Sequence, residues 1–174
     1  IGGRFSSIST VVANNVARWD GSAWHSLGTL DENGTNGIVR ALTFDAAGNL
    51  YLGGDFTQAG GKAVGHVAGW NGTSWFVLGS EGTANGFVLN GVDGPVYALA
   101  YAPAYGAYHA RVYIGGQFRA VTEAGGSWGT TQFDSPNLTA WQTGCQSYQG
   151  STCFQRYPYL STNGQVVDLA IGSG

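Results

Sequence analysis

Charge is the scarcest property of this sequence of 174 residues. Charged residues make up 10% of it, with seven Lys and Arg against ten Asp and Glu, and the formal net charge at pH 7 is −3. The basic residues form no cluster, so the sequence lacks the electrostatic footprint of a nucleic-acid-binding protein. Low charge predicts disorder only where hydrophobicity is also low, and here 43% of the residues are hydrophobic. We therefore expect a folded chain with an apolar core.

Methionine is absent, and no apolar run reaches the ~20 residues of a transmembrane helix. No signal peptide is recognisable, and Ile1 falls inside an expected strand, which suggests a mature or excised piece of a longer product. Glu, Lys and Met, which favour helices, are rare, whereas the chain has 30 Gly and 13% aromatic residues. This composition predicts tightly turned β structure.

Cysteine occurs only twice, at Cys145 and Cys153, within a stretch rich in Gly and Ser. Their short separation suits a local disulfide, which predicts an oxidising compartment. Two free thiols are the alternative. None of the three His lies nearby in the sequence, so a zinc site at the cysteines would lack further ligands.

What the sequence does contain is a repeat, in which Gly-Gly-x-Phe is followed by tryptophan. The first two copies are 51 residues apart without a gap, and the third carries an insertion of nine residues before its tryptophan. The shared positions are Gly2, Gly3, Phe5, Trp19 and Trp24 in the first copy, Gly53, Gly54, Phe56, Trp70 and Trp75 in the second, and Gly115, Gly116, Phe118 and Trp141 in the third. Such regular recurrence favours tryptophans that pack between neighbouring units, and the alternative is a platform on which sugars stack. The missing side chains of the Gly-Gly pair would let neighbouring units approach closely.

A second repeated element is an apolar alternation at 39–44, 96–101 and 166–171, which is typical of a half-buried strand. Each full unit then has four short strands. Turn signals such as Asp20-Gly21 and Asn71-Gly72 separate them, because a type I′ hairpin turn needs positive φ at both central residues. Four antiparallel strands in roughly 40–50 residues are typical of a β-propeller blade. We therefore predict an all-β fold of propeller-type blades, about three in this chain.

We treat residues 1–174 as a single repeat domain. The predicted blades span 1–30, 37–80 and 94–160, and the last includes an insertion at 122–136 and a disulfide loop at 144–154. The first blade lacks its first strand, which either residues 164–174 or another chain would supply. Three arrangements stay open: a larger ring with blades elsewhere in the parent chain, a ring of two copies, or a polymer in which a tail strand completes the next molecule.

The string Tyr-Leu-Gly-Gly-Asp-Phe at 51–56, followed by Trp-Asn-Gly-Thr-Ser-Trp at 70–75, resembles the repeats of secreted or cell-surface β-propeller proteins. Such repeats occur in bacterial surface proteins and in the fungal cortical polarity markers. The resemblance covers residues 1–121 well and the remainder poorly. It implies a β-propeller with a structural or interaction role, and it transfers no catalytic motif.

No group of residues predicts catalysis. The ten carboxylates are scattered, the three histidines fall at different repeat phases, and no phosphate-binding Gly-rich motif precedes a helix. The loop Asp31-Glu32-Asn33-Gly34 lacks the ligand spacing of a calcium site. We therefore expect that the protein is not an enzyme and that it binds neither a metal ion nor a cofactor.

Asn-x-Ser/Thr occurs at Asn33, Asn71 and Asn137. We expect Asn33 and Asn71 on turns or loops with room for a glycan. In a eukaryotic source at least one of the three sites should be glycosylated, and in a bacterial source none.

These observations predict an extracellular or cell-surface structural module with no membrane span, whose partners are copies of itself or other surface proteins. One alternative is a glycan-binding module that uses the aromatic residues of the C-terminal part, namely Trp128, Tyr148, Tyr157 and Tyr159. Another is an enzyme on a propeller scaffold with its catalytic residues in blades outside this chain.

Overall fold

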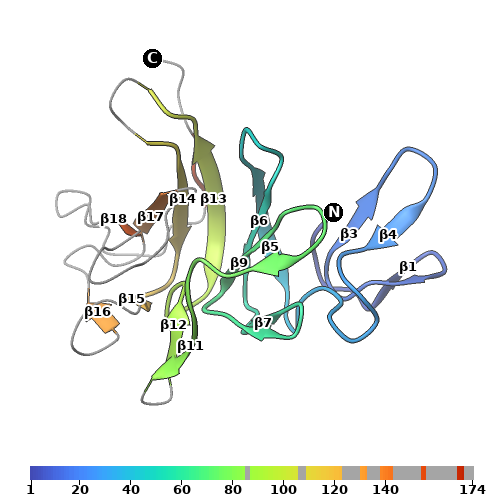
Figure 1. The fold of residues 1–174 in the computed structure, drawn as a ribbon, viewed down its shortest axis with the longest axis horizontal. Coiled ribbons are helices and arrows are strands. Elements are labelled where there is room, and N and C mark those ends of the chain that lie inside the picture. The colour runs from blue at the N-terminus through green and yellow to red at the C-terminus, as the bar shows by residue number, and fades with distance from the viewer. Residues whose placement is uncertain are drawn as a thin grey trace.

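The computed structural model describes residues 1–84, 87–105, 109–122, 130–132, 138–142, 154–155 and 168–170. Within these residues all regular elements are β-strands, and all strand pairs are antiparallel (Figure 1). The predicted all-β class is confirmed.

Two four-stranded sheets contain most of the longer strands. In each, the order of strands in space follows their order in the chain. One sheet consists of β5 (Val39–Phe44), β6 (Leu50–Gly54), β9 (Val67–Trp70) and β10 (Trp75–Phe76). The other consists of β13 (Val96–Ala102), β14 (Arg111–Gly116), β17 (Leu138–Gln142) and β18 (Phe154–Gln155). We call these sheets, with their loops, the second and third units.

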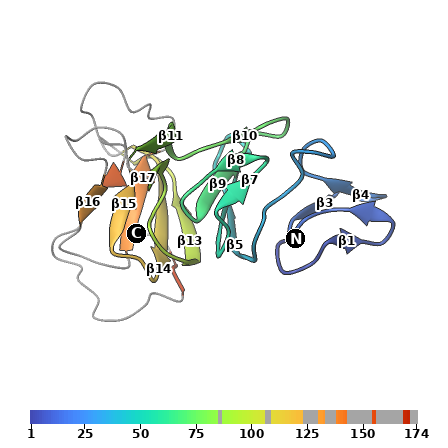
Figure 2. The same cartoon turned by 90° about the horizontal axis from the view of Figure 1, so that it is seen from below.

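The first unit contains the hairpin of β3 (Ala17–Trp19) and β4 (Trp24–Ser26). Residues 1–3 lie beside this hairpin. Gly2 forms an isolated antiparallel β-bridge with Val16, and the Ala17 N–H donates to the Ile1 carbonyl over 3.0 Å. Among the described residues, no strand occupies the place that β5 takes in the second unit. The three units lie side by side, with the second in the middle (Figure 2).

A small hairpin that the sequence analysis did not predict follows the second strand of each unit. These hairpins pair β1 (Ser7–Ile8) with β2 (Val11–Val12), β7 (Gln58–Ala59) with β8 (Lys62–Ala63), and β15 (Ala120–Thr122) with β16 (Thr130–Gln132). The turn of the second hairpin has positive φ at Gly60 and Gly61, 54° and 73°, as a type I′ turn requires. A further hairpin of β11 (Gly79–Ala84) and β12 (Phe87–Asn90) connects the second unit to the third.

In the first two copies, the first glycine of the Gly-Gly pair lets neighbouring units approach closely, as expected. A Cβ at Gly53 would lie 2.3 Å from Val96 Cγ1 of the third unit. A Cβ at Gly2 would lie 2.5 Å from Val39 Cγ1 of the second unit. Any side chain at these positions would therefore push the sheets apart.

Apolar clusters fill the spaces between the units. One joins the first and second units through Val16, Leu27, Val39, Leu52 and Trp75. The other joins the second and third units through Tyr51, Val67, Leu78, Val96 and Ile114. The core thus lies between sheets rather than within one of them.

The repeated tryptophans are not buried alike. Trp75 is 5% exposed and donates its indole N–H to the Leu27 carbonyl over 3.1 Å, so it packs between units as predicted. Trp19, by contrast, is 50% exposed. Trp19 therefore does not show the predicted burial between units.

A buried asparagine is hydrogen-bonded within each of the two described loops between units, a role that the sequence did not predict. Asn90 is fully buried, where its Oδ1 accepts from the Gly65 N–H over 3.1 Å and its Nδ2 donates to the Ala63 carbonyl over 3.2 Å. Asn33 stands 57 residues earlier, at the same repeat position, and donates to the Val12 carbonyl over 2.8 Å. The recurrence of Asn-Gly at 33–34 and 90–91 was the signal that could have revealed this role.

Candidate functional site

A row of polar side chains crosses from the second unit to the third at one rim. The Arg40 guanidinium donates to both Asp55 oxygens, over 2.7 and 2.6 Å. Its Cζ lies 5.3 Å from the centroid of the Tyr97 ring, and the Tyr97 hydroxyl donates to Gln117 Oε1 over 3.2 Å. The row arises because the first strand of each unit begins where the second strand ends. Hydrogen bonds from Arg40 hold the pKa of Asp55 below its ordinary value, but this partly exposed pair adds little stability.

His66 lies beside this row in a conformation that histidine rarely adopts. Its φ is 60°, and Asn15, at the same repeat position, has a φ of 64°. Asn15 uses both side-chain atoms, since its Oδ1 accepts from the Phe5 N–H over 3.2 Å and its Nδ2 donates to the Thr35 carbonyl over 2.8 Å. His66 Nδ1 is buried and has no hydrogen-bond partner. Such a departure from local preference is typical of functional positions, which makes His66 a candidate.

Replacing His66 with asparagine is expected to stabilise the protein. Asparagine tolerates positive φ better than histidine, and the substitution removes a buried unpaired nitrogen, so a gain of about 1 kcal/mol in the free energy of unfolding is expected. Burial lowers the pKa of His66 below its ordinary value of 6.5, although a hydrogen bond with the Gly54 backbone and the nearby carboxylates of Asp55 and Asp93 act in the opposite direction. The folded state therefore favours neutral histidine, and wild type loses stability as the pH falls below about 6.5.

Urea unfolding of wild type and His66→Asn, at about pH 7.5 and about pH 5.5, measures both effects. The advantage of the variant should grow at the lower pH, because the asparagine does not titrate. An advantage that stays the same at both pH values would contradict the role given to His66 burial.

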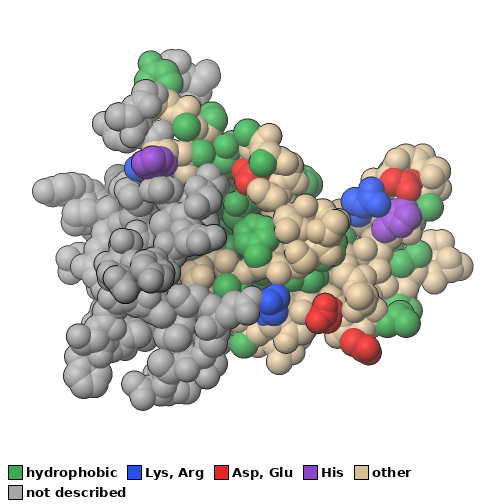
Figure 3. All heavy atoms as spheres, viewed as in Figure 1, with side chains coloured by type: hydrophobic (Ala, Val, Ile, Leu, Met, Phe, Trp, Pro, Cys, Tyr) green, Lys and Arg blue, Asp and Glu red, His purple; other side chains and the backbone are tan. Residues whose placement is uncertain are grey.

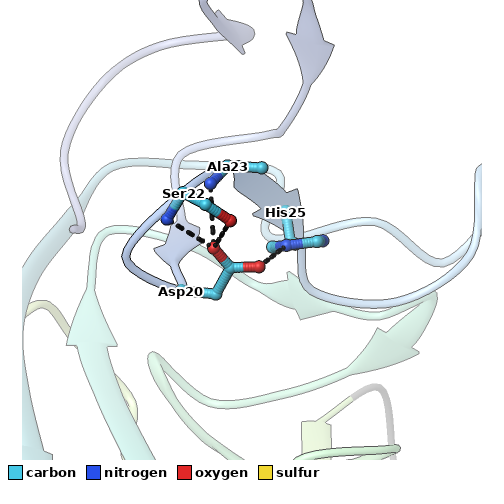
Figure 4. A network of polar contacts seen from close by, with 4 residues as sticks. All are labelled: Asp20, Ser22, Ala23 and His25. Carbon is cyan, nitrogen blue, oxygen red and sulfur yellow. Dashed lines mark hydrogen bonds and ion pairs between the residues drawn. The ribbon is translucent and has the colours of Figure 1, made fainter.

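A second polar network closes the β3–β4 hairpin of the first unit (Figure 4). Asp20 Oδ1 accepts from the Ser22 and Ala23 N–H groups, each over 2.8 Å, while Asp20 Oδ2 contacts His25 Nε2. The backbone hydrogen bonds, and to a smaller extent the His25 contact, hold the pKa of Asp20 far below its ordinary value. A serine nucleophile would need its hydroxyl hydrogen-bonded to the histidine, but the Ser22 hydroxyl donates to Asp20 instead.

The second unit shows that this network belongs to the turn. Asn71 occupies the position of Asp20, and its Oδ1 accepts from the Thr73 and Ser74 N–H groups over 3.0 and 2.8 Å. Both hairpins are therefore closed by an Asp or Asn side chain that caps its own turn. Figure 3 shows acidic, basic and His side chains together over the β3–β4 hairpin.

A pocket of about 370 Å³, which we call the inter-unit pocket, opens between the first and second units. Val16, Leu27 and Trp24 line it from the first unit, and Leu42, Phe44 and Trp70 line it from the second. Trp19 and Arg18 also reach it. The lining is mainly apolar and aromatic, so the pocket suits an apolar or aromatic group better than a charged one.

The structure shows the exposure of two of the three candidate glycosylation sites. Asn33 is buried and hydrogen-bonded, so the room that we expected for a glycan is missing there. Asn71 is exposed at the turn between β9 and β10 and has that room, and its glycosylation stays a prediction. Asn137 lies outside the described residues, at the repeat position of Asn15 and His66.

Several other predicted residues also lie outside the described part of the chain: Cys145, Cys153, Trp128, Tyr148, Tyr157 and Tyr159. The disulfide and the aromatic glycan platform therefore stay predictions. Within the described ranges, no three His, Cys, Asp or Glu side chains are grouped so that they could hold a metal ion. The same residues include no helix that could span a membrane.

The fold and these sites define the chain as an all-β protein of small antiparallel sheets packed side by side. No protein-family model, curated protein or solved structure matches it.

Proposed function

We propose that this chain is an extracellular structural module of propeller-type blades, which mediates contacts between proteins in a cell-surface or filamentous array. The observation that carries the proposal is the packing between units. Sheets join face to face through apolar clusters, and none of the sheets formed by the described residues is closed. A module built in this way can extend by adding further sheets to its open faces.

Exposed apolar side chains of the first unit support this function. Trp19, Val12 and Ile1 are exposed, although Trp70, at the repeat position of Trp19, packs against a neighbouring unit. Exposed aromatic and aliphatic side chains that lie together are typical of surfaces that bind another protein. The low charge of the chain agrees with contacts dominated by packing rather than by ion pairs.

Glycan binding is the second candidate, and the inter-unit pocket favours it. Trp19 and Phe44 are exposed aromatic residues at this pocket, and Arg18 adds a hydrogen-bond donor. Glycan-array binding that is lost in Trp19→Ala, with the fold retained, would support this function over assembly.

Electron microscopy of the purified protein, together with sedimentation velocity over a wide range of concentrations, tests the assembly function. Dimers, rings or filaments that grow with concentration are expected, because the open faces would become buried. A protein that stays monomeric throughout and shows no lateral assembly on grids would refute the proposal.

A further inference from the structure

A second pocket, which we call the loop pocket, lies at the loop that connects β4 of the first unit to β5 of the second. Its volume is about 180 Å³. In contrast to the inter-unit pocket, its lining is mainly polar and includes the side chains of Asn14, Asp31, Asn33 and Gln58. Each of these side chains carries an oxygen atom that can accept a hydrogen bond or bind a cation.

One oxygen in this lining is buried without a partner. Asn33 is 8% exposed, and its Nδ2 donates to the Val12 carbonyl over 2.8 Å. Its Oδ1 is buried and has no hydrogen-bond partner. Buried polar groups in native structures are nearly always paired, so an unpaired acceptor indicates either a water molecule or an ion that binds there.

The next loop between units shows which partner Asn33 lacks. There Asn90 Oδ1 accepts from the Gly65 N–H over 3.1 Å. A Cβ at Gly65 would lie 2.6 Å from the Val92 carbonyl oxygen and closer still to that of Asn90, so the loop can lie on this backbone only because Gly65 has no side chain. Asn14 stands at the position of Gly65, 51 residues earlier. Its side chain therefore keeps Asn33 away from the backbone amide that Oδ1 would otherwise reach.

The Asn14 side chain also adds an oxygen to the pocket that its presence opens. Its Nδ2 donates to the Asn33 carbonyl over 3.2 Å, which leaves its Oδ1 as a further ligand for a cation. Asp31 supplies a carboxylate and Gln58 an amide oxygen, both from exposed positions. The loop pocket thus combines one carboxylate with three amide oxygens, one of which is buried and unpaired.

We propose that the loop pocket binds a calcium ion through these four side chains. Ca²⁺ takes about six to eight oxygen ligands and accepts carboxylates, amide carbonyls and water together, whereas Mg²⁺ demands a near-ideal octahedron. A second carboxylate lies at the edge of the pocket, since Glu32 Cγ would be 3.6 Å from a Cβ at Gly61, which also lines it. The volume of about 180 Å³ leaves room for water ligands, each of which occupies about 30 Å³.

The ligands come from three separate segments of the chain, and most of them are amides. The spacing within residues 31–34 therefore could not reveal the site, and the sequence predicted no metal. A bound ion would join the first unit, through Asn14, to the second unit, through Gln58. With few carboxylates the affinity should be low, in the range of about 10⁻⁴–10⁻³ M that is typical of extracellular calcium modules. Calcium binding here does not depend on the assembly function.

Thermal unfolding with and without calcium tests the site. For wild type, about 10 mM CaCl₂ should raise Tm by about 5 °C relative to chelator-treated protein, because the ion binds only the folded state. MgCl₂ at the same concentration should raise Tm much less. Isothermal titration calorimetry with CaCl₂ should give one site of the same affinity.

Three variants test whether the ion lies in the loop pocket. Asp31→Asn should weaken calcium binding about tenfold or more, whereas Gln58→Glu adds a carboxylate at an exposed position and should tighten it about tenfold. Asn14→Gly introduces the glycine of the other loop and should abolish the calcium response without unfolding the chelator-treated protein. Asp168→Asn is the matched control, since Asp168 is exposed and does not line the pocket.

Wild type whose Tm does not change with calcium overturns the proposal, as does an equal change with magnesium. A calcium response that both Asp31→Asn and Asn14→Gly retain would show that the ion binds elsewhere and would overturn it as well. A response that Asp168→Asn weakens as much as Asp31→Asn would indicate a general effect of charge, with the same consequence. The assembly function is measured separately, by sedimentation velocity in chelator, and stands or falls on that result.

Discussion

Replacing Trp75 with alanine should destabilise the protein by about 3–5 kcal/mol, the usual cost of deleting a buried tryptophan side chain. Trp75 packs with Val16 and Leu27 in the cluster that joins the first unit to the second. Its indole N–H also donates to the Leu27 carbonyl. That carbonyl still accepts from the Gly34 N–H over 3.1 Å, so most of the cost should come from the cavity that the substitution leaves.

Urea unfolding measures this loss, and Trp24→Ala is the matched control. Trp24 stands 51 residues earlier at the same repeat position, but it is only half-buried. It should cost about 1 kcal/mol, because less of its surface leaves water on folding. Equal losses for the two variants would show that Trp75 does not join the units.

Hydrogen exchange can locate the effect of Trp75→Ala. Amide protection should fall in β3 and β4, which pack on the second unit through this residue, and should be kept in β13 and β14. A uniform fall in protection would mean that the three units unfold together.

The second large effect is expected for Asn90→Ala, at about 3 kcal/mol. The substitution deprives the Gly65 N–H and the Ala63 carbonyl of this hydrogen-bond partner. A buried polar group left unsatisfied costs about 1–3 kcal/mol. Asn90 is fully buried, so water can replace the amide only if the surrounding loop opens.

Asn33→Ala is the control for this prediction. Asn33 donates one hydrogen bond, to the Val12 carbonyl, and its Oδ1 has no partner. The loss should therefore be about half as large, roughly 1–2 kcal/mol. Thermal and urea unfolding of both variants measure the difference. If Asn33→Ala proves as costly as Asn90→Ala, the second hydrogen bond of Asn90 does not contribute as described.

Much of the local structure could be predicted from the sequence. The alternation at 39–44 and 96–101 becomes β5 and β13, whereas residues 168–170 of the third alternation form no strand. The Asn71-Gly72 signal becomes the turn between β9 and β10, but φ is positive at Gly72 and not at Asn71, so the turn is not the predicted type I′. These features depend on backbone preferences and on periodicity within a few residues. The small hairpins after each second strand were missed because strands of two or three residues are too short to show a period.

The candidate site was harder to predict. Arg40 lies on β5 and Asp55 follows β6, 15 residues away, and neither position repeats its charge in the other copies. His66 is unremarkable in the sequence and becomes a candidate only through its positive φ and its unpaired nitrogen. Asn33 looked like a glycosylation site because the three-residue motif carries no information about burial.

By itself the sequence determined the all-β class, the four-strand unit and the positions of its turns, because these follow from interactions between residues close together in the chain. Only the tertiary structure decided which copy of a repeated residue is buried. Trp75 is buried against the first unit, whereas Trp24, its counterpart in the first copy, is only half-buried. Burial depends on which sheet packs against a residue, and that sheet is formed by residues that lie tens of positions away in the chain.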